Sequence, residues 1–255
     1  MKIDVYFSPV QVDEIQLRDK NVVVIDILRS STTITTALKN GAREIIPVSN
    51  VESAVKVSGN LFGDVVLRGG ERNGKIIPGF NLGNSPAEYT EEAVKGKSII
   101  FCTTNGSGAM VRAKYAKNMA VGGFVNISLV VDFMKQINDN FSVICAGKQH
   151  LFSIEDAVCA GMIVKLLQDH DPENVELNDA ASAALTLFKN YGKNLHKMAR
   201  SSDHGKYLVE IGFADDVKIC VEVDSIPVLP LLIGNMIKLK KEEPKPAPPL
   251  DAKTS

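Results

Sequence analysis

The chain has 255 residues and a mass of 27.6 kDa, and its 29 Lys and Arg nearly balance its 30 Asp and Glu. This length allows one large or two small domains with a substantial core, and an apolar share of 45% is ordinary for a globular protein. A net charge of −1 argues against a surface dedicated to nucleic acid, and an aromatic share of 6% without Trp argues against a stacking platform for single strands.

Short apolar runs alternate with helical patterns in roughly the first 150 residues. Five runs predict strands that are covered on both faces. They are Val22–Leu28, Asp64–Arg68, Ser98–Cys102, Met119–Gly122 and Ser142–Ala146. Four helices are expected between them, at Ser31–Asn40, Val51–Gly59, Ser107–Lys117 and Asn126–Asn138. This alternation predicts an α/β sheet with helices on both faces.

Helical patterns dominate after residue 153. They predict helices at Ile154–His170, Leu177–Tyr191 and Ser202–Ile211. Two late apolar runs, Val217–Val223 and Ile226–Leu232, predict strands, and the prolines at 227 and 230 favour an edge position for the second run. We see no internal repeat and no linker within residues 1–237, so we expect a single α/β domain over that range.

The remaining residues, 238–255, have a different composition. They contain five Lys, two Glu and one Asp, so this tail carries +2 and the rest of the chain −3. They also hold four of the 11 prolines. Because so few apolar groups cannot offset the entropy of ordering, we expect a disordered extension.

The sequence also favours a cytoplasmic location. No run reaches the length of about 18 apolar residues that a membrane span needs, and the start, MKIDVYFSPV, lacks the apolar core of a signal peptide. Cys102, Cys145, Cys159 and Cys220 are widely spaced, without a CxxC pair. We therefore expect free, buried thiols rather than disulfides or a zinc site.

Polar residues follow four of the predicted strands, and ligands bind beyond the carboxyl ends of strands in open α/β sheets. The first polar segment runs from Asp26 through Arg29, Ser30, Ser31, Thr32 and Thr33. An arginine and hydroxyls at a helix start suit a phosphate, and Asp26 would serve as a metal ligand or a nucleophile. Alternatively, a serine caps the helix and Asp26 is a structural acid.

The second polar segment, Arg68–Lys75, contains the GxxxxGK that opens a P-loop. Ile76 stands where Mg²⁺ binding needs Ser or Thr, and Pro78 is followed by glycine where a helix is needed, so we reject an ATP-binding P-loop. The glycines would instead let the backbone approach a ligand, with Arg72 as an anion anchor. A mobile polar loop is the alternative.

The third segment, Thr103–Ala109, resembles the start of a dinucleotide fingerprint. Val111 replaces its third glycine and no acid follows at about 20 positions, which disfavours a nicotinamide-dependent oxidoreductase. Asn105 would instead face an anion. The fourth segment carries Lys148 and then Ser153, Glu155 and Asp156, where Ser153 and Asp156 have the pattern of a helix cap.

His204, between Asp203 and Gly205, is the strongest candidate for acid–base chemistry, although the same residues could simply begin a helix.

The order and composition of these segments resemble the ComB family, the 2-phosphosulfolactate phosphatases. The resemblance spans residues 22–230 and lies in VVVIDILRSSTTITTALKNGA, GGERNGKIIPGFNLGNSPAEY, TTNGSGA, CAGKQHLFSIEDAVCAG, SSDHGKYL and FADDVKICVEVDSIPVLP. Three positions depart from the expected family pattern. Asn81 replaces an Asp, Ser107 replaces a Thr, and His150 replaces a Gly.

The resemblance implies a three-layer α/β/α sandwich with a mixed, largely parallel sheet. It also implies Mg²⁺-dependent hydrolysis of (2R)-2-phospho-3-sulfolactate to sulfolactate and phosphate, a step of coenzyme M biosynthesis. A related phosphatase for another 2-phospho-hydroxyacid is the nearest alternative. A further alternative is a protein that binds phospho-anions without catalysis. Asn81 is the only residue in the sequence that favours it. We expect no nucleic acid or membrane partner. A homodimer is expected only because homodimers are the commonest oligomers.

On this basis each candidate residue receives a predicted role. Mg²⁺ would be held by Asp26, Glu155 and Asp156. Arg29 and the helix start at Ser31, Thr32 and Thr33 would stabilise the phosphoryl oxygens. Arg72, Asn84, Asn105 and Lys148 would bind the acidic groups of the substrate. His204 would protonate the leaving alkoxide. Whether Asp26 attacks phosphorus directly stays open at this point.

Overall fold

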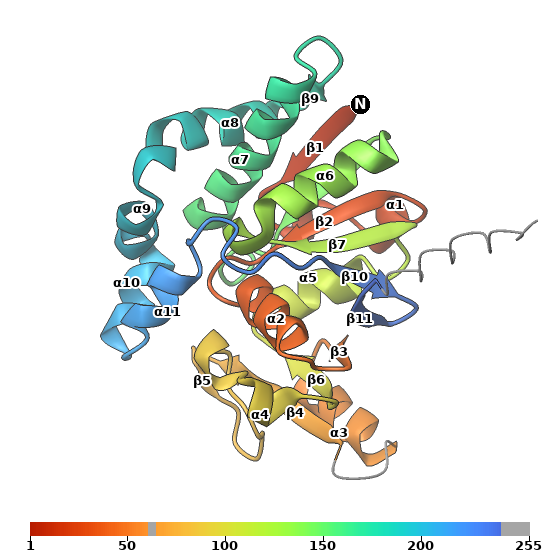
Figure 1. Cartoon of the computed structure of the whole chain (residues 1–255), viewed down its shortest axis with the longest axis vertical. Coiled ribbons are helices and arrows are strands. Elements are labelled where there is room, and N and C mark those ends of the chain that lie inside the picture. The colour runs from red at the N-terminus through yellow and green to blue at the C-terminus, as the bar shows by residue number, and fades with distance from the viewer. Residues whose placement is uncertain (61–64, 241–255) are drawn as a thin grey trace, which may run out of the picture.

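The computed structural model describes residues 1–60 and 65–240 and is built on one large mixed sheet (Figure 1). Its strands are β1 (Lys2–Tyr6), β2 (Asn21–Ile25), β3 (Glu44–Pro47), β4 (Val66–Arg72), β5 (Lys75–Ile76), β6 (Ser98–Cys102), β7 (Asn118–Gly122), β8 (Phe141–Cys145), β9 (Glu176–Leu177), β10 (Pro230–Ile233) and β11 (Met236–Leu239). Within the described residues the sheet order is β5-β4-β6-β3-β11-β10-β7-β2-β8-β1-β9. Two parallel blocks, β4-β6-β3 and β7-β2-β8-β1-β9, are joined through the antiparallel hairpin β10–β11.

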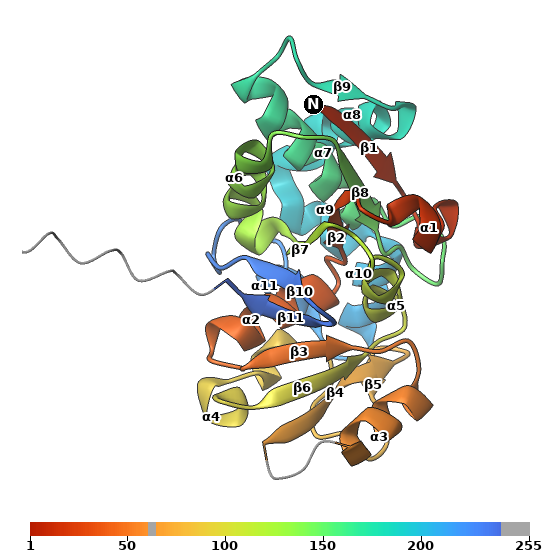
Figure 2. The same ribbon diagram turned by 90° about the vertical axis from the view of Figure 1, so that its right-hand side faces the viewer.

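Helices cover both faces of this sheet (Figure 2). They are α1 (Glu14–Leu17), α2 (Ser30–Lys39), α3 (Val51–Asn60), α4 (Glu91–Val94), α5 (Gly106–Arg112), α6 (Ile127–Ile137), α7 (Ile154–His170), α8 (Asp179–Tyr191), α9 (Leu195–Ser201), α10 (Asp203–Glu210) and α11 (Ala214–Ile219). In β2, Val23 and Ile25 pack into the cluster under α6 and α7, whereas Val22 and Val24 pack into the cluster under α2 and α5. Successive side chains of a strand point to opposite faces, so a continuous apolar run is what a doubly covered strand requires. The predicted α/β fold with a largely parallel sheet is confirmed.

Two late strand predictions need correction. Val217–Val223 is not a strand, because Ala214–Ile219 forms α11 and a turn follows. A short β-branched run has no periodicity that separates strand from helix, and the acids in the first turn favour the helix. The second run forms β10 only from Pro230 onward, and β10 lies between β11 and β7 rather than at an edge.

The end of the described chain belongs to the sheet. β11 extends to Leu239, and the Lys238 ammonium lies 2.8 Å from the Glu44 carboxylate of β3. The predicted tail therefore begins with two residues of strand. Residues 241–255, for which disorder is predicted, lie outside the described residues, as does Asp64 of the predicted second strand. All four cysteines are free and buried as expected. Across residues 1–60 and 65–240, no helix is both long and apolar enough to cross a membrane.

Gly161 controls how closely α7 and α8 approach each other. A Cβ at this position would lie 2.0 Å from the carbonyl oxygen of Ala184 in α8. We expect Gly161→Ala to lower the free energy of unfolding by about 1–3 kcal/mol, because the helices must move apart. Gly59→Ala in α3 is the matched control, since a Cβ there meets nothing within 4 Å and is expected to stabilise by about 0.5–1 kcal/mol. Equal urea midpoints for the two variants would contradict this packing.

Candidate active site

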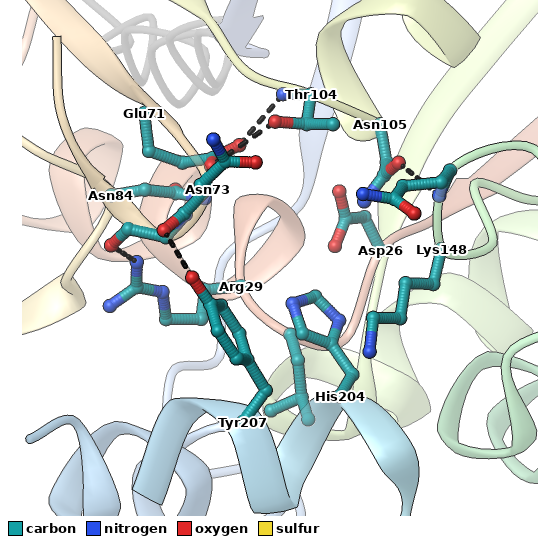
Figure 3. Close-up of a pocket in the computed structure, with 13 residues that line it drawn as sticks. Asp26, Arg29, Glu71, Asn73, Asn84, Thr104, Asn105, Lys148, His204 and Tyr207 are labelled. Carbon is teal, nitrogen blue, oxygen red and sulfur yellow. Dashed lines mark hydrogen bonds between the residues drawn. The ribbon is translucent and has the colours of Figure 1, made fainter. Parts of the chain in front are cut away.

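A pocket of about 310 Å³ lies beyond the carboxyl ends of β2, β6 and β8, beside α10 (Figure 3). It is lined by Asp26, Leu28, Arg29, Glu71, Asn73, Gly74, Asn84, Thr104, Asn105, Lys148, Gln149, His204 and Tyr207. These residues come from both parallel blocks of the sheet. The position is the one that open α/β sheets use for ligands.

Asp26 leaves β2 at the base of this pocket and is only 4% exposed. Its Oδ2 accepts a hydrogen bond of 2.8 Å from the Ser30 hydroxyl. A Cβ on Gly106 would lie 2.4 Å from that same oxygen, so glycine is needed for α5 to approach Asp26. This packing explains the glycine of the apparent dinucleotide fingerprint without a dinucleotide.

The surroundings of Asp26 weaken its acidity. Burial raises the pKa of Asp26 to about 6, although the hydrogen bond from Ser30 and the nearby His204 oppose that rise. The negative charge of Glu71 adds to it. A carboxyl group with this pKa changes protonation close to physiological pH, which is typical of functional acids.

His204 and Glu155 form a pair at the wall of the pocket. His204 lies in the first turn of α10, and its Nδ1 is 3.6 Å from Oε1 of Glu155, whose side chain is 2% exposed. That Glu155 oxygen accepts no hydrogen bond from the described residues. Although burial alone would raise the pKa of Glu155, the contact with His204 lowers it below its ordinary value. A buried carboxylate beside one ring nitrogen can orient an imidazole for proton transfer.

Asp156 is tied to the ends of two strands. Its carboxylate accepts backbone N–H bonds from Ile27 at 2.8 Å and from Gly147 at 3.0 Å. Burial, followed by the charges of Asp26 and Glu155, raises the pKa of Asp156 well above its usual range. Within the described part of the chain, no group of three or more His, Cys, Asp or Glu side chains is arranged to hold a metal ion. The predicted three-acid site is therefore not preassembled, and of the three acids only Asp26 lines the pocket.

Arg29 lies at the pocket with its guanidinium held on two sides. Nη1 is 2.6 Å from the Asp216 carboxylate, and Nη2 donates to the Gly74 carbonyl oxygen at 2.8 Å. The group also stacks 4.2 Å from the centre of the Phe213 ring and is 2% exposed. This arrangement fixes the position of Gly74 and leaves little of Arg29 for a phosphate.

Several predicted substrate contacts lie away from the pocket. Ser31, Thr32 and Thr33 are fully buried and do not line it, because the first turn of α2 runs into the core. Arg72 donates to the Cys102 sulfur at 3.2 Å. Side chains alternate along β4, so Glu71 faces the pocket and Arg72 faces the opposite side.

The other predicted contacts do line the pocket. Asn84 is 5% exposed, and its Oδ1 has no hydrogen-bond partner among the described residues. Asn105 accepts from the backbone N–H of Gln149 at 2.8 Å, and the Lys148 ammonium donates to the Asp203 carbonyl oxygen at 3.2 Å.

The sequence did not single out six lining residues. Their roles depend on turn geometry and strand alternation, which a single sequence does not display. They are Leu28, Glu71, Asn73, Thr104, Gln149 and Tyr207. Among these six, Tyr207 alone carries a usable signal, because it follows His204 by three residues and shares its helix face. Gly74, one of the glycines expected to let the backbone approach a ligand, does line the pocket.

Comparison with known proteins agrees with this geometry. The family model described as 2-phosphosulpholactate phosphatase matches residues 6–235. The chain belongs to the 2-phosphosulfolactate phosphatase family. A protein of Caldanaerobacter subterraneus subsp. tengcongensis is 38% identical over 242 residues, covering 95% of this chain and 100% of that protein. Others, from Symbiobacterium thermophilum and Thermotoga maritima, are 38% and 37% identical and cover 88% and 87% of this chain and 96% and 93% of their own lengths. All three bear the name "Probable 2-phosphosulfolactate phosphatase".

Membership of the 2-phosphosulfolactate phosphatase family confirms the resemblance inferred from the sequence. The departure at Asn81 does not lie at the pocket. Asn81 is exposed, and its Oδ1 accepts a hydrogen bond of 2.9 Å from the Arg68 backbone N–H. The replacement of Asp by Asn therefore leaves the charge of the pocket lining unchanged, and it no longer points to a binder without catalytic activity.

Proposed function

We propose that this chain hydrolyses the phosphate ester of (2R)-2-phospho-3-sulfolactate to sulfolactate and inorganic phosphate. One observation carries the chemical part of the proposal: the buried carboxylate of Asp26 and the imidazole of His204 line the same small pocket. The names of the relatives support the choice of substrate.

Each residue at the pocket has a separate proposed role in this reaction. Asp26 either attacks phosphorus or positions the attacking water. His204 donates a proton to the leaving alkoxide, which departs poorly without one, and Glu155 holds the imidazole. Lys148 and the amides of Asn84 and Asn105 orient the acidic groups. Arg29 and Asp216 keep the Gly74 side of the pocket in place.

Mg²⁺ is the proposed cofactor because acidic side chains concentrate around Asp26. Mutual repulsion contributes to the raised pKa of Asp156, and a divalent cation would relieve it. Asp26 would hold the ion directly, with water and phosphate oxygens completing its shell, while Glu155 and Asp156 add negative charge. When bound, the ion would neutralise the charge of the phosphoryl oxygens.

Phosphate release from a series of phosphoacids tests this function. The series contains 2-phosphosulfolactate and other 2-phospho-hydroxyacids, assayed after chelator treatment and again after Mg²⁺ is restored. Preference for 2-phosphosulfolactate with a requirement for Mg²⁺ is the expected result. Preference for another member would establish the related phosphatase instead. Tight binding of every member without phosphate release would establish a non-catalytic binder.

His204→Asn is expected to lower kcat about 10²–10⁴-fold on 2-phosphosulfolactate, because the leaving alkoxide loses its proton donor. On p-nitrophenyl phosphate the loss is expected to be below tenfold, because that leaving group departs without protonation. His196→Asn, at an exposed position in α9, is the matched control and should leave both rates unchanged. Equal losses on both substrates would rule out the role of His204 as general acid.

Three wider expectations accompany the proposal. They are a place in coenzyme M biosynthesis, a cytoplasmic location and a homodimeric state, the last of which sedimentation of the purified protein would test.

A further inference from the structure

The β4–β5 hairpin ends in a tight turn at the mouth of the pocket. β4 and β5 pair Arg72 with Lys75, which leaves Asn73 and Gly74 as a two-residue loop. Both residues have positive φ, 51° and 71°, as a type I′ turn requires. Asn and Gly are the residues that adopt this backbone most easily. Both turn residues line the pocket, and the Asn73 side chain points into it (Figure 3).

Side chains from three segments hold this turn. Glu71, 7% exposed, accepts from the Gly74 N–H at 2.8 Å and from the Thr104 N–H at 2.7 Å. Arg29 donates to the Gly74 carbonyl oxygen, and the Tyr207 hydroxyl donates to the Asn73 carbonyl oxygen at 2.9 Å. A Cβ on Gly74 would also lie 2.6 Å from the side chain of Ile211, the C-cap residue of α10. The turn therefore packs directly against the end of this helix. The backbone of Asn73 is therefore fixed on both sides, while its side-chain amide makes no hydrogen bond to the part of the chain that the structure describes and can meet a ligand.

The wall that contains Asn73 offers neutral donors. Glu71 on this wall is already engaged by backbone N–H groups, and Arg29 behind it is paired with Asp216. Lys148 and His204 lie on the opposite side, near Asp26 (Figure 3). A substrate with its phosphate at Asp26 would place a second anionic group against the amides of Asn73 and Asn84.

We propose that Asn73 is a specificity-determining residue, held rigidly by the turn, that donates from its amide to the second anionic group of the substrate. The inference rests on the proposed function and extends it to the part of the substrate that does not react. A phosphomonoester with a carboxylate or sulfonate near the ester oxygen is the substrate class that fits.

Asn73→Asp tests the inference with a change of charge and almost none of shape. Asp has the same size and also suits the first position of a type I′ turn before glycine. Asn81→Asp is the matched control, because it adds the same charge at an exposed site outside the pocket lining. The measurement is kcat/KM for 2-phosphosulfolactate, 2-phospholactate, 2-phosphoethanesulfonate and isopropyl phosphate. If isopropyl phosphate turns over too slowly, the inhibition constant of inorganic phosphate replaces it.

The expected result is selective. Asn73→Asp should lower kcat/KM by about tenfold or more for substrates with the recognised anion, relative to isopropyl phosphate. The loss should shrink as salt is added, because Asn73 is exposed and the new charge is screened. A loss with 2-phospholactate identifies the carboxylate, and a loss with 2-phosphoethanesulfonate identifies the sulfonate.

Two other outcomes distinguish a failure of the role proposed for Asn73 from a failure of the proposed function. If wild type hydrolyses 2-phosphosulfolactate but Asn73→Asp changes all four values equally or none of them, the role of Asn73 is overturned and the proposed function stands. If wild type releases phosphate from none of the four, the proposed function itself fails.

Discussion

Asp26→Asn is expected to abolish phosphate release and, at the same time, to make the fold more stable at pH 8. The activity should fall by at least about 10³-fold, because the buried group at the base of the pocket loses its charge and its nucleophilic oxygen. Stability should rise because wild type holds a buried carboxylate whose pKa is raised from 3.8 to about 6. One pKa unit corresponds to about 1.4 kcal/mol, so the gain is on the order of 1–3 kcal/mol.

The pH dependence of this gain has a definite sign. The folded protein binds the proton of Asp26 more tightly than the unfolded chain, so wild type is penalised above pH 6 and not below about pH 4. The free energy of unfolding measured with urea should therefore be higher for Asp26→Asn than for wild type at pH 8. The two values should be equal near pH 4. The kcat/KM of wild type should fall as pH drops through about 6.

Full activity in Asp26→Asn would exclude Asp26 both as nucleophile and as metal ligand. A trapped phosphoenzyme in wild type would favour direct attack by Asp26. With a substrate that is chiral at phosphorus, inversion of configuration would favour a single displacement by water, and retention would favour two displacements through a phosphoenzyme.

Asp216→Ala is expected to be among the most destabilising single substitutions in the chain. Asp216 and Arg29 are 3% and 2% exposed and lie 2.6 Å apart, and Asp216 also accepts from the Ser85 hydroxyl at 2.8 Å. Removal of one partner leaves a buried guanidinium unpaired, which costs about 3–5 kcal/mol. The Gly74 side of the pocket would also lose its support, so the KM should rise.

A double variant tests whether the unpaired charge is the cause. Arg29→Met combined with Asp216→Leu removes both charges and should recover much of the loss, because apolar side chains of similar size can replace a buried ion pair. Glu91→Gln, which breaks the exposed pair with Lys95, should leave the urea midpoint unchanged. If the double variant is no more stable than Asp216→Ala, the effect comes from lost packing rather than from the charge.

The central strands and their polar carboxyl ends could be predicted because the relevant signals are local. A run such as Val22–Ile25 has apolar side chains on both faces, and the polar residue after it must lie at the edge of the sheet. The same reasoning predicts that Asp26 and Lys148, which follow β2 and β8, lie at the pocket, and both line it. The proposed substrate comes from the family resemblance, because the pattern of strands and polar loops does not indicate it.

The remaining features depend on contacts between distant segments. Whether Glu71 or Arg72 faces the pocket depends on which face β4 turns toward its neighbours. The pairing of Arg29 with Asp216 spans 187 residues, and nothing near either residue indicates it. β10 occupies the interior of the sheet despite Pro230 because the proline is its first residue, and the pairing with the distant strand β7 joins Leu231 to Ala120.

The hairpin β10–β11 has a consequence for biosynthesis. Its strands are the last in the described chain, yet they join the block that carries Glu71 and Asn73 to the block that carries Asp26 and Lys148. The two parallel blocks therefore cannot join into one sheet before β10 and β11 have been synthesised, and until then β3 and β7 are unpaired edges. Exposed edges of this kind invite pairing with other chains. A chaperone that shields β3 and β7 during synthesis would therefore improve the yield of active protein more than its final stability.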